Sequence, residues 1–490
     1  IPPPQPTSPR IECRRQRQMC IRDRVLVGGY VWLQEQRPDL MPWHKAVLDA
    51  EFRAADAAGY RGFDDYLQQE ERLFGQLQHE VYDRVETTEQ TPFNRYATDS
   101  LLNPQNHRQN WNRTFVLEPE RPVGGVLMLH GLSDSPYSMR ALGERLAGQG
   151  LLVIGLRLPG HGTAPSALLD MTWQDQAAAV RLAMGELRRR LDPSRPLYIA
   201  GYSNGAALAV EYALSVLEGE ALPAVDALVL LSPAIGVSPV AALAIWQSRL
   251  SWLFGLKKLA WTDLALEIDP YKYNSFTVNA GDQIFRLTGN IAARIGKLAD
   301  SGALGRFPRT IAFQSVVDAT IPPATLIDLL FMQLGRGYHE LVLFDVNRHA
   351  ESTSLMRADP ESLTARLLRE PELPFDITLL TNVSAESDTV VARRKAAGAT
   401  SGEASPTDLV WPQGLFSLSH VAIPFPPDDP VYGGVFNHPG GERQITLGSV
   451  SIRGERNLLQ IPDNYFLRLR YNPFFEFLVA RSLEFLDLAK

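Results

Sequence analysis

The sequence predicts an α/β fold: a mostly parallel sheet with helices on both faces and a helical cap inserted between two of its later strands. Two observations support this prediction. Short apolar runs rich in β-favouring residues alternate with segments of helical periodicity, which indicates parallel strands buried on both faces. A long segment, residues 237–308, then separates the runs that carry Leu231 and Ile311, and it has no strand rhythm of its own.

The composition is that of a globular protein, with 45% hydrophobic and 21% charged residues among 490. A net charge of −7 argues against a nucleic-acid-binding surface. Cys13 and Cys20 are the only cysteines, so the body of the chain has neither a disulfide framework nor a cysteine metal site. The sequence contains no P-loop, G-x-G-x-x-G or H-E-x-x-H motif, and we predict no metal and no organic cofactor.

Residues 1–24 differ from the rest and are interpreted as a non-native or disordered leader. They are rich in proline and arginine, and residues 18–24 resemble translated sequencing-adapter sequence; a basic targeting arm is the alternative. Residues 25–33 are apolar but shorter than the roughly 20 residues that span a bilayer. They are either the stub of a membrane anchor or the start of a buried element, which leaves a membrane-anchored and a bacterial-type cytoplasmic location both open.

Residues 25–112 are predicted to form a helical extension that precedes the sheet. Apolar residues recur at helical spacing between residues 66 and 81, with glutamines, glutamates and His79 between them. We interpret His44 and His79 as surface positions.

The first part of the sheet is predicted over residues 113–236, and its second part over residues 309–490. Apolar β-favouring runs predict its strands at residues 113–117, 125–129, 151–156, 197–200, 227–231, 309–317, 340–344 and 374–381. An insertion around residues 345–410 follows the strand at 340–344. Within it, residues 385–406 are rich in small and charged residues and are interpreted as a mobile surface loop.

The strand at 197–200 leads directly into G-Y-S-N-G at residues 201–205, and an alanine-rich helical segment follows. Strand, tight turn and helix are the context in which G-x-S-x-G forms a nucleophile elbow. The two glycines leave room for a sharp turn, and the start of the helix directs free N–H groups at whatever binds Ser203. The alternative is a glycine-rich turn with an incidental serine.

Four stretches together resemble the α/β-hydrolase superfamily: L-H-G-L at 129–132, L-P-G-H-G at 158–162, the elbow, and V-V-D-A-T-I-P at 316–322. The sequence looks most like the lineage of monoacylglycerol lipases, bacterial carboxylesterases and serine aminopeptidases. The stretches occur in the family's order between residues 113 and 344. The chain departs from the family after the strand at 340–344, where the family places its histidine almost at once.

This resemblance implies a catalytic triad in the chain order serine, acid, histidine. Ser203 is then the nucleophile and Asp318 the acid; the alternative for Asp318 is a turn or helix-cap aspartate. His349 lies where the simple family spacing places the base, five residues after Phe344. We favour His420, which lies in a long irregular loop after the additional strand, and keep His349 as the alternative base.

The oxyanion hole is expected from the backbone N–H groups of Leu132 and Asn204. His130 and His161 are interpreted as structural neighbours of that hole, and His438 is a remote third candidate for the base.

The leading functional hypothesis is a serine hydrolase that cleaves small carboxylic esters, either lipid-like or short-chain, through an acyl-enzyme on Ser203. Aromatic residues crowd the first half of the cap, which favours an apolar acyl pocket. An aminopeptidase is the first alternative, with Asp263, Glu267 and Asp269 as candidates to hold a substrate ammonium. A non-catalytic binding protein with this fold is the second. The oligomeric state stays open.

Overall fold

The computed structural model describes residues 36–236, 257–350, 360–434, 453–454 and 467–489. The predicted leader at 1–24, the apolar run at 25–33, the first part of the predicted cap and His438 lie outside the described residues.

Within the described residues, ten strands form one central sheet in the order β1-β3-β2-β4-β5-β8-β9-β10-β11-β12. The strands from β3 to β10 in this order are parallel, and β1, β11 and β12 pair antiparallel at the two edges. The bounds are β1 Phe115–Leu117, β2 Gly124–Leu129, β3 Leu151–Leu156, β4 Leu197–Tyr202, β5 Ala227–Leu231, β8 Arg309–Ser315, β9 His339–Phe344, β10 Asp376–Asn382, β11 Thr389–Lys395 and β12 Glu403–Val410. The predicted α/β class with a mostly parallel sheet is confirmed.

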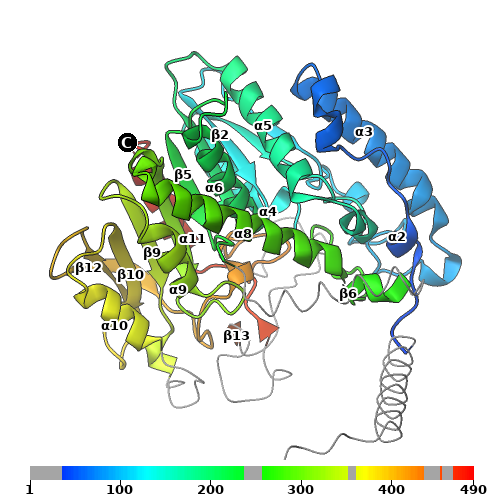
Figure 1. The fold of residues 1–490 in the computed structure, drawn as a ribbon. Coiled ribbons are helices and arrows are strands. Elements are labelled where there is room, and N and C mark those ends of the chain that lie inside the picture. The colour runs from blue at the N-terminus through cyan, green and yellow to red at the C-terminus, as the bar shows by residue number, and fades with distance from the viewer. Residues whose placement is uncertain (1–35, 237–256, 351–359, 435–452, 455–466, 490) are drawn as a thin grey trace, which may run out of the picture.

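Helices cover both faces of this sheet. Side chains at alternate positions of each strand point to opposite faces, so Leu127 and Leu129 of β2 belong to one apolar cluster and Val126 and Met128 to the other. The helices of the first face are α5 Trp173–Arg190, α6 Asn204–Leu217, α8 Val278–Asp300 and α10 Glu361–Arg369, and those of the second are α4 Tyr137–Gly148 and α11 Phe475–Phe485. Helices α5, α6 and α8 lie side by side in Figure 1.

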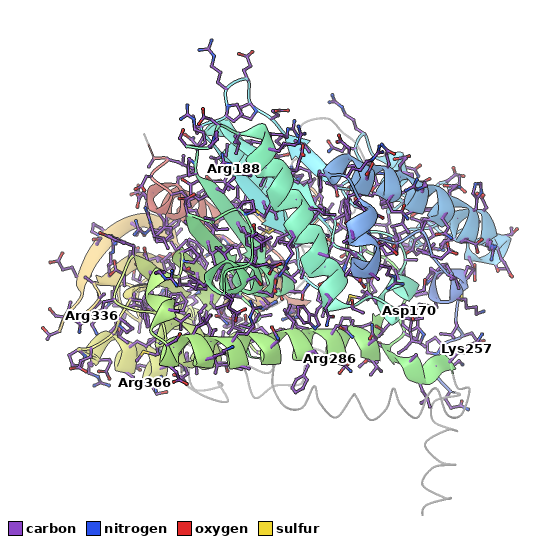
Figure 2. All side chains as sticks on the ribbon, turned by 45° about the horizontal axis from the view of Figure 1, so that its top comes forward. Asp170, Arg188, Lys257, Arg286, Arg336 and Arg366 are labelled. Atoms are coloured by element: carbon purple, nitrogen blue, oxygen red, sulfur yellow. The ribbon has the colours of Figure 1, made fainter. Side chains whose placement is uncertain are left out.

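Local sequence explains where the long helices begin. Thr172 starts α5 because its hydroxyl accepts the N–H of Asp175, whose carboxylate accepts the N–H of Thr172 in return. Thr277 starts α8 in a similar way by accepting the N–H of Ala280. Charged side chains such as Arg286 on α8 and Arg366 on α10 are exposed on the outside of the helical layer (Figure 2).

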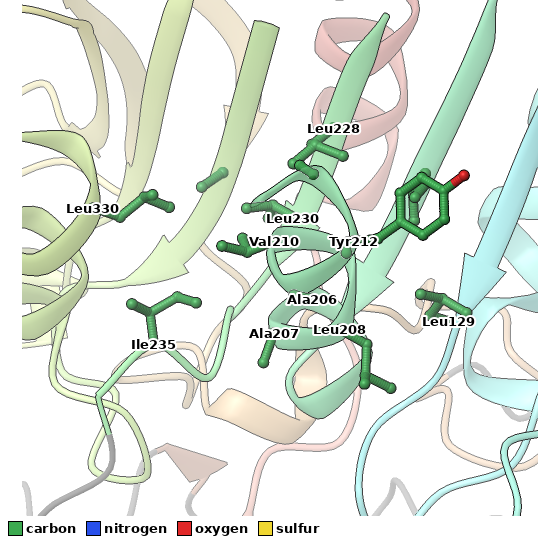
Figure 3. Packing of buried hydrophobic residues seen from close by; sticks show 14 of the residues in the cluster. Leu129, Ala206, Ala207, Leu208, Val210, Tyr212, Leu228, Leu230, Ile235 and Leu330 are labelled. Atoms are coloured by element: carbon green, nitrogen blue, oxygen red, sulfur yellow. The ribbon is translucent and has the colours of Figure 1, made fainter. Parts of the chain in front are cut away.

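Helix α6 is the most deeply buried helix of the first face. Ala206, Ala207 and Val210 pack against Leu228 and Leu230 of β5 and their neighbours (Figure 3). The small side chains of its first turn let its backbone come very close to the end of β2. A Cβ atom built on Gly205 would lie 2.2 Å from the carbonyl oxygen of Leu129. Glycine is therefore the residue that this packing permits.

The insertion after β9 contains more regular structure than the sequence predicts. Residues 385–406 are not a loop, because β11 and β12 form an antiparallel hairpin that extends the sheet. β12 is the edge strand and β11 lies next to it, and the exposed Arg393, Arg394 and Asp408 of this hairpin obscure the alternation of apolar and polar residues. The prediction of a mobile loop there was wrong, whereas the strand predicted at 374–381 corresponds to β10.

The described part of the predicted cap contains short strands β6 Trp261–Asp263 and β7 Phe276–Thr277 and the long helix α8. Leu287, Ile291 and Ile295 of α8 join the apolar cluster on the first face of the sheet. The division of the chain at residues 237 and 308 stays a prediction. Among the described residues, no helix combines the length and the apolar character that crossing a membrane requires.

The helical extension includes α2 Pro42–Lys45 and α3 Phe63–Glu80. His79 of α3 is exposed, but the prediction of a surface position for His44 was wrong. His44 is buried against the ring of Trp261, with Nε2 3.0 Å from Ser275 Oγ and Nδ1 accepting the N–H of Met41. Trp261 and Ser275 lie more than 200 positions away in the sequence, so the residues around His44 do not indicate that it is buried.

We predict that Gly205→Ala destabilises the fold by about 2 kcal/mol or more, because the added methyl group meets backbone atoms that cannot rotate away. Gly75→Ala is the matched control, since a Cβ on that exposed residue of α3 meets nothing within 4 Å. This control is expected to gain about 0.5–1 kcal/mol. Urea unfolding of both variants measures the difference; equal stabilities would contradict the close approach.

We also predict that the buried His44 makes the fold less stable as the pH falls below 6.5. Burial lowers the pKa of His44 to about 4, so between pH 6.5 and 4 the unfolded chain binds a proton that the folded chain does not. Its contribution to the free energy of unfolding therefore falls by about 2 kcal/mol between neutral pH and pH 5. Denaturant unfolding at pH 7.5 and at pH 5 measures the fall in the free energy of unfolding between the two pH values. This fall should be about 2 kcal/mol smaller in His44→Gln than in wild type. An equal decrease in both proteins would show that His44 is not responsible.

Candidate active site

Ser203 occupies the turn between β4 and α6 in a strained backbone conformation. Its φ is 53° and its ψ −112°, a region that residues with a side chain rarely adopt. The turn is fixed by backbone hydrogen bonds on both sides. The N–H of Ser203 donates to the carbonyl of Leu231 at 2.9 Å, and the N–H of Ala234 donates to the carbonyl of Ser203 at 3.1 Å.

The two glycines of the elbow lie where backbones nearly touch. A Cβ on Gly201 would be 2.5 Å from the carbonyl oxygen of Gly205, which itself abuts the end of β2. The sharp turn carries the serine hydroxyl to the carboxyl end of the parallel strands. Ser203 is partly exposed there, as a nucleophile that meets a substrate must be.

The side chains of Ser203, His420 and Asp318 form one chain of hydrogen bonds. His420 Nε2 lies 3.0 Å from Ser203 Oγ, and His420 Nδ1 lies 2.8 Å from Asp318 Oδ2. Because a carboxylate only accepts, we assign the ring proton to Nδ1, which leaves Nε2 to accept the proton of the serine hydroxyl. This arrangement makes His420 a base directed at Ser203.

Asp318 is held by hydrogen bonds in the turn that follows β8. Its Oδ1 accepts the N–H groups of Thr320 and Ile321, both at 2.9 Å, while Oδ2 faces the imidazole. The side chains of Asp318 and His420 are both nearly inaccessible to solvent. Backbone donors on one oxygen and the imidazole on the other fix the carboxylate in a single orientation.

His420 is positioned by contacts of its own carbonyl and of the two residues that precede it. Ser315 Oγ, at the end of β8, donates to the carbonyl of Leu418 at 2.8 Å, and Ser419 Oγ donates to the carbonyl of Leu469. The hydroxyl of Tyr202, the residue before the serine, lies 3.4 Å from the carbonyl of His420. The loop that carries His420, here called the histidine loop, thus contacts β8, the elbow and the segment around Leu469.

The alternative base, His349, lies outside this constellation. It follows β9 in a short turn, its side chain is exposed, and its Nδ1 is 3.3 Å from the carbonyl of Ala385. Strands β10, β11 and β12 lie between His349 and His420 in the chain. In the sequence, the irregular, proline-rich loop around residue 420 favoured a histidine after this insertion over one before it.

The predicted oxyanion-hole residues lie on the two elements that flank Ser203. Leu132 follows β2 and Asn204 begins α6. Neither backbone N–H has an acceptor among the described residues, so both are free to bind an oxyanion. The side chain of Asn204 points away, donating to Gln176 Oε1 at 3.0 Å in the buried helical layer.

Two buried histidines support the loop that carries Leu132. His130 Nε2 accepts the N–H of Leu158 at 3.0 Å, so its proton lies on Nδ1, which donates to the carbonyl of Gly131 at 2.9 Å. His161 Nε2 lies 2.5 Å from the carbonyl of Leu132 and Nδ1 lies 3.0 Å from that of Pro159, and we assign the single ring proton to Nε2, which makes the shorter contact. Burial lowers the pKa of both histidines, His130 well below its ordinary value, so both are neutral near pH 7.

The carboxylates considered for binding an ammonium are not alike. Asp263 is exposed, whereas Glu267 and Asp269 are buried and engaged inside the protein. Glu267 accepts the N–H groups of two residues of the same segment, and burial raises its pKa above the ordinary value. Asp269 accepts from the hydroxyl of Tyr432 at 2.5 Å and pairs with Arg470 at 3.1 Å. Both buried carboxylates thus already have hydrogen-bond partners within the protein.

A cavity of about 140 Å³ lies beside the histidine loop. Its lining is mixed and partly charged: Asp269, Lys272, Tyr273, Asn274, Val421, Phe425, Tyr432, Arg468 and Arg470. Aromatic residues of the predicted cap take up other roles, since Tyr271 stacks on Tyr137 at 3.9 Å between ring centres. The cap residues that were expected to form an acyl pocket at 246, 252 and 254 lie outside the described residues. Among the described residues, no cluster of His, Cys, Asp or Glu side chains is suited to hold a metal.

Comparisons with known proteins point to the same superfamily. Residues 120–295 match the family described as "Serine aminopeptidase, S33". A curated relative, the thermostable monoacylglycerol lipase of Bacillus sp. (strain H-257), is 33% identical over 121 residues, which are 25% of this chain and 44% of the relative. The chain thus spans less than half the length of that relative.

Two solved structures are also similar. One is described under the metagenome-derived lipolytic enzymes LipS and LipT, and it is 25% identical in sequence. The alignment covers 48% of this chain and 87% of that chain, with a TM-score of 0.38. The other is the Paleococcus ferrophilus monoacylglycerol lipase, with 18% identity, 47% and 88% coverage, and a TM-score of 0.36. The mostly parallel sheet is that of the α/β-hydrolase fold, and residues 120–295 are similar to a family of serine hydrolases that have this fold.

Proposed function

We propose that this protein hydrolyses carboxylic esters through an acyl-enzyme on Ser203. The observation that carries the proposal is the chain of hydrogen bonds from Ser203 through His420 to Asp318. A serine hydroxyl becomes a nucleophile when a neutral imidazole takes its proton and a carboxylate stabilises the resulting imidazolium. Similarity to a protein named monoacylglycerol lipase favours esters over other acyl compounds.

The reaction would proceed in two steps. Ser203 Oγ attacks the ester carbonyl while His420 Nε2 takes its proton, and the resulting oxyanion binds the N–H groups of Leu132 and Asn204. One such donor is worth about 3–4 kcal/mol of transition-state stabilisation. His420 then gives the proton to the leaving alcohol. Water, activated by the same histidine, attacks the acyl-enzyme, and the acid product leaves with Ser203 restored.

Peptide hydrolysis is the second candidate, and the description of the matched family, serine aminopeptidase, favours it. An aminopeptidase must also bind the ammonium of its substrate. The engagement of Glu267 and Asp269 within the protein argues against that role for them and supports the ester proposal. We further infer that residues 237–308 act as a cap over a core built from residues 113–236 and 309–490.

The test is steady-state hydrolysis of p-nitrophenyl esters from acetate to laurate by wild type, Ser203→Ala, His420→Ala and Asp318→Asn. We expect each substitution to lower kcat/KM on the order of 10⁴-fold or more, by analogy with serine proteases. His349→Ala is the matched control, because that exposed histidine lies outside the hydrogen-bonded chain, and it should keep wild-type activity.

Circular dichroism establishes that each variant is folded. Loss of activity in His349→Ala with an active His420→Ala would overturn the assignment of the base. Turnover of alanine p-nitroanilide without turnover of any ester would replace the ester proposal with the peptidase.

A further inference from the structure

The helical extension contributes a buried carboxylate to the loop that supports the oxyanion hole. Glu51 lies in the extension, ahead of α3, and is almost inaccessible to solvent. Its Oε2 accepts the N–H of Gly160 at 2.8 Å, and its two oxygens pair with both terminal nitrogens of Arg157 at 2.8 and 3.0 Å. The matched family region begins at residue 120, so this contact joins a segment outside that region to one inside it.

Arg157 is the centre of this cluster and is itself completely buried. Besides Glu51, it reaches Glu70 of α3 through Nε at 3.2 Å and the carbonyl of His161 through Nη1 at 3.0 Å. The backbone carbonyl of Arg157 accepts a hydrogen bond from the hydroxyl of Tyr66 at 2.6 Å. A planar guanidinium with partners on every side admits one orientation, so the extension fixes the loop at residues 157–162.

That loop in turn fixes the peptide that supplies one oxyanion-hole donor. In a trans peptide, the carbonyl and the N–H point in opposite directions. The carbonyl of Gly131 belongs to the same peptide as the N–H of Leu132, and His130 holds it from one side. The N–H of Leu132 is therefore directed to the other side. Leu158 fixes the tautomer of His130 that makes this hydrogen bond, and His161 holds the next carbonyl, that of Leu132.

We propose that Glu51 is a positioning residue for the oxyanion hole, acting through Arg157 and Gly160 on His161 and so on Leu132. The extension is then a working part of the active site rather than only a cover for one face of the fold. The proposal rests on the ester hydrolysis proposed above. Glu51 touches no substrate; it sets the direction of a donor that stabilises charge in the transition state.

The experiment compares Glu51→Gln with Glu340→Gln in the full chain. Glu340 is the matched control because it is also a buried carboxylate paired with an arginine, Arg481, but it lies at the opposite end of a strand from the site. With p-nitrophenyl butyrate, Glu51→Gln is expected to lower kcat between about 10-fold and 100-fold with KM changed less than about 3-fold. Glu340→Gln should leave both constants near wild type.

A second readout isolates the oxyanion hole. A trifluoromethyl ketone forms a tetrahedral adduct with an active serine, whose oxyanion occupies that hole. Its inhibition constant should rise in Glu51→Gln by about the factor by which kcat falls, and should not rise in Glu340→Gln. Burst titration gives the concentration of competent sites, so that both values refer to folded enzyme.

Unchanged kcat and inhibitor affinity in folded Glu51→Gln would overturn the proposal, as would equal losses in Glu340→Gln. If Glu51→Gln does not fold, Glu51→Asp takes its place: it keeps the charge but is too short to reach Arg157 and Gly160 together, and unchanged kcat there has the same meaning. The proposed function is contradicted instead if wild type cleaves no ester, or if Ser203→Ala retains full esterase activity. Failure of the ester-hydrolase proposal is thereby distinguished from failure of the proposal about Glu51.

Discussion

The close approach of helix α6 to the ends of β2 and β4 is the constraint on which the site depends. It is possible because Gly201 and Gly205 have no side chains, and it forces the residue between strand and helix into a positive φ. Ser203 is thereby presented at the carboxyl end of the sheet, next to the loops that follow β2 and β8. Those loops carry Leu132, whose N–H we propose for the oxyanion hole, and the carboxylate of Asp318, so one backbone contact brings the serine close to both groups.

The sequence was most informative where structure depends on neighbouring residues. The strands β2, β3, β4, β5, β8 and β9 were predictable because buried parallel strands are apolar throughout and are bounded by turns. The short strands β6 and β7 were not predicted, because they lie in the segment that was expected to be a helical cap. The elbow was predictable because a sharp turn between strand and helix leaves no room for side chains at the positions of its two glycines. The sequence predicts Ser203, Asp318 and His420 as site residues, and in the structure the imidazole of His420 lies within hydrogen-bonding distance of both other side chains.

The sequence was least informative where structure depends on distant partners. The hairpin β11–β12 carries charge on an edge of the sheet, and its composition is that of a loop. The sequence predicts Glu70 on the polar side of a helix, yet it is buried because it pairs with Arg157, 87 residues away. His44 has the same explanation through Ser275 and Trp261. A polar residue is buried only when a partner compensates for its desolvation, and such partners leave no mark in the adjacent sequence.

The insertion between β9 and His420 has a consequence for how the enzyme is made. During synthesis the amino-terminal part of a chain emerges from the ribosome first and begins to fold first. A nascent chain that has completed β9 already holds the serine, its elbow and the carboxylate of Asp318. It still lacks the base, and the Leu469 carbonyl that accepts from Ser419 arrives later still. Ser203 therefore has no imidazole beside it until residue 420 has been added, and a product that ends at β9 would lack the hydrogen bond between them.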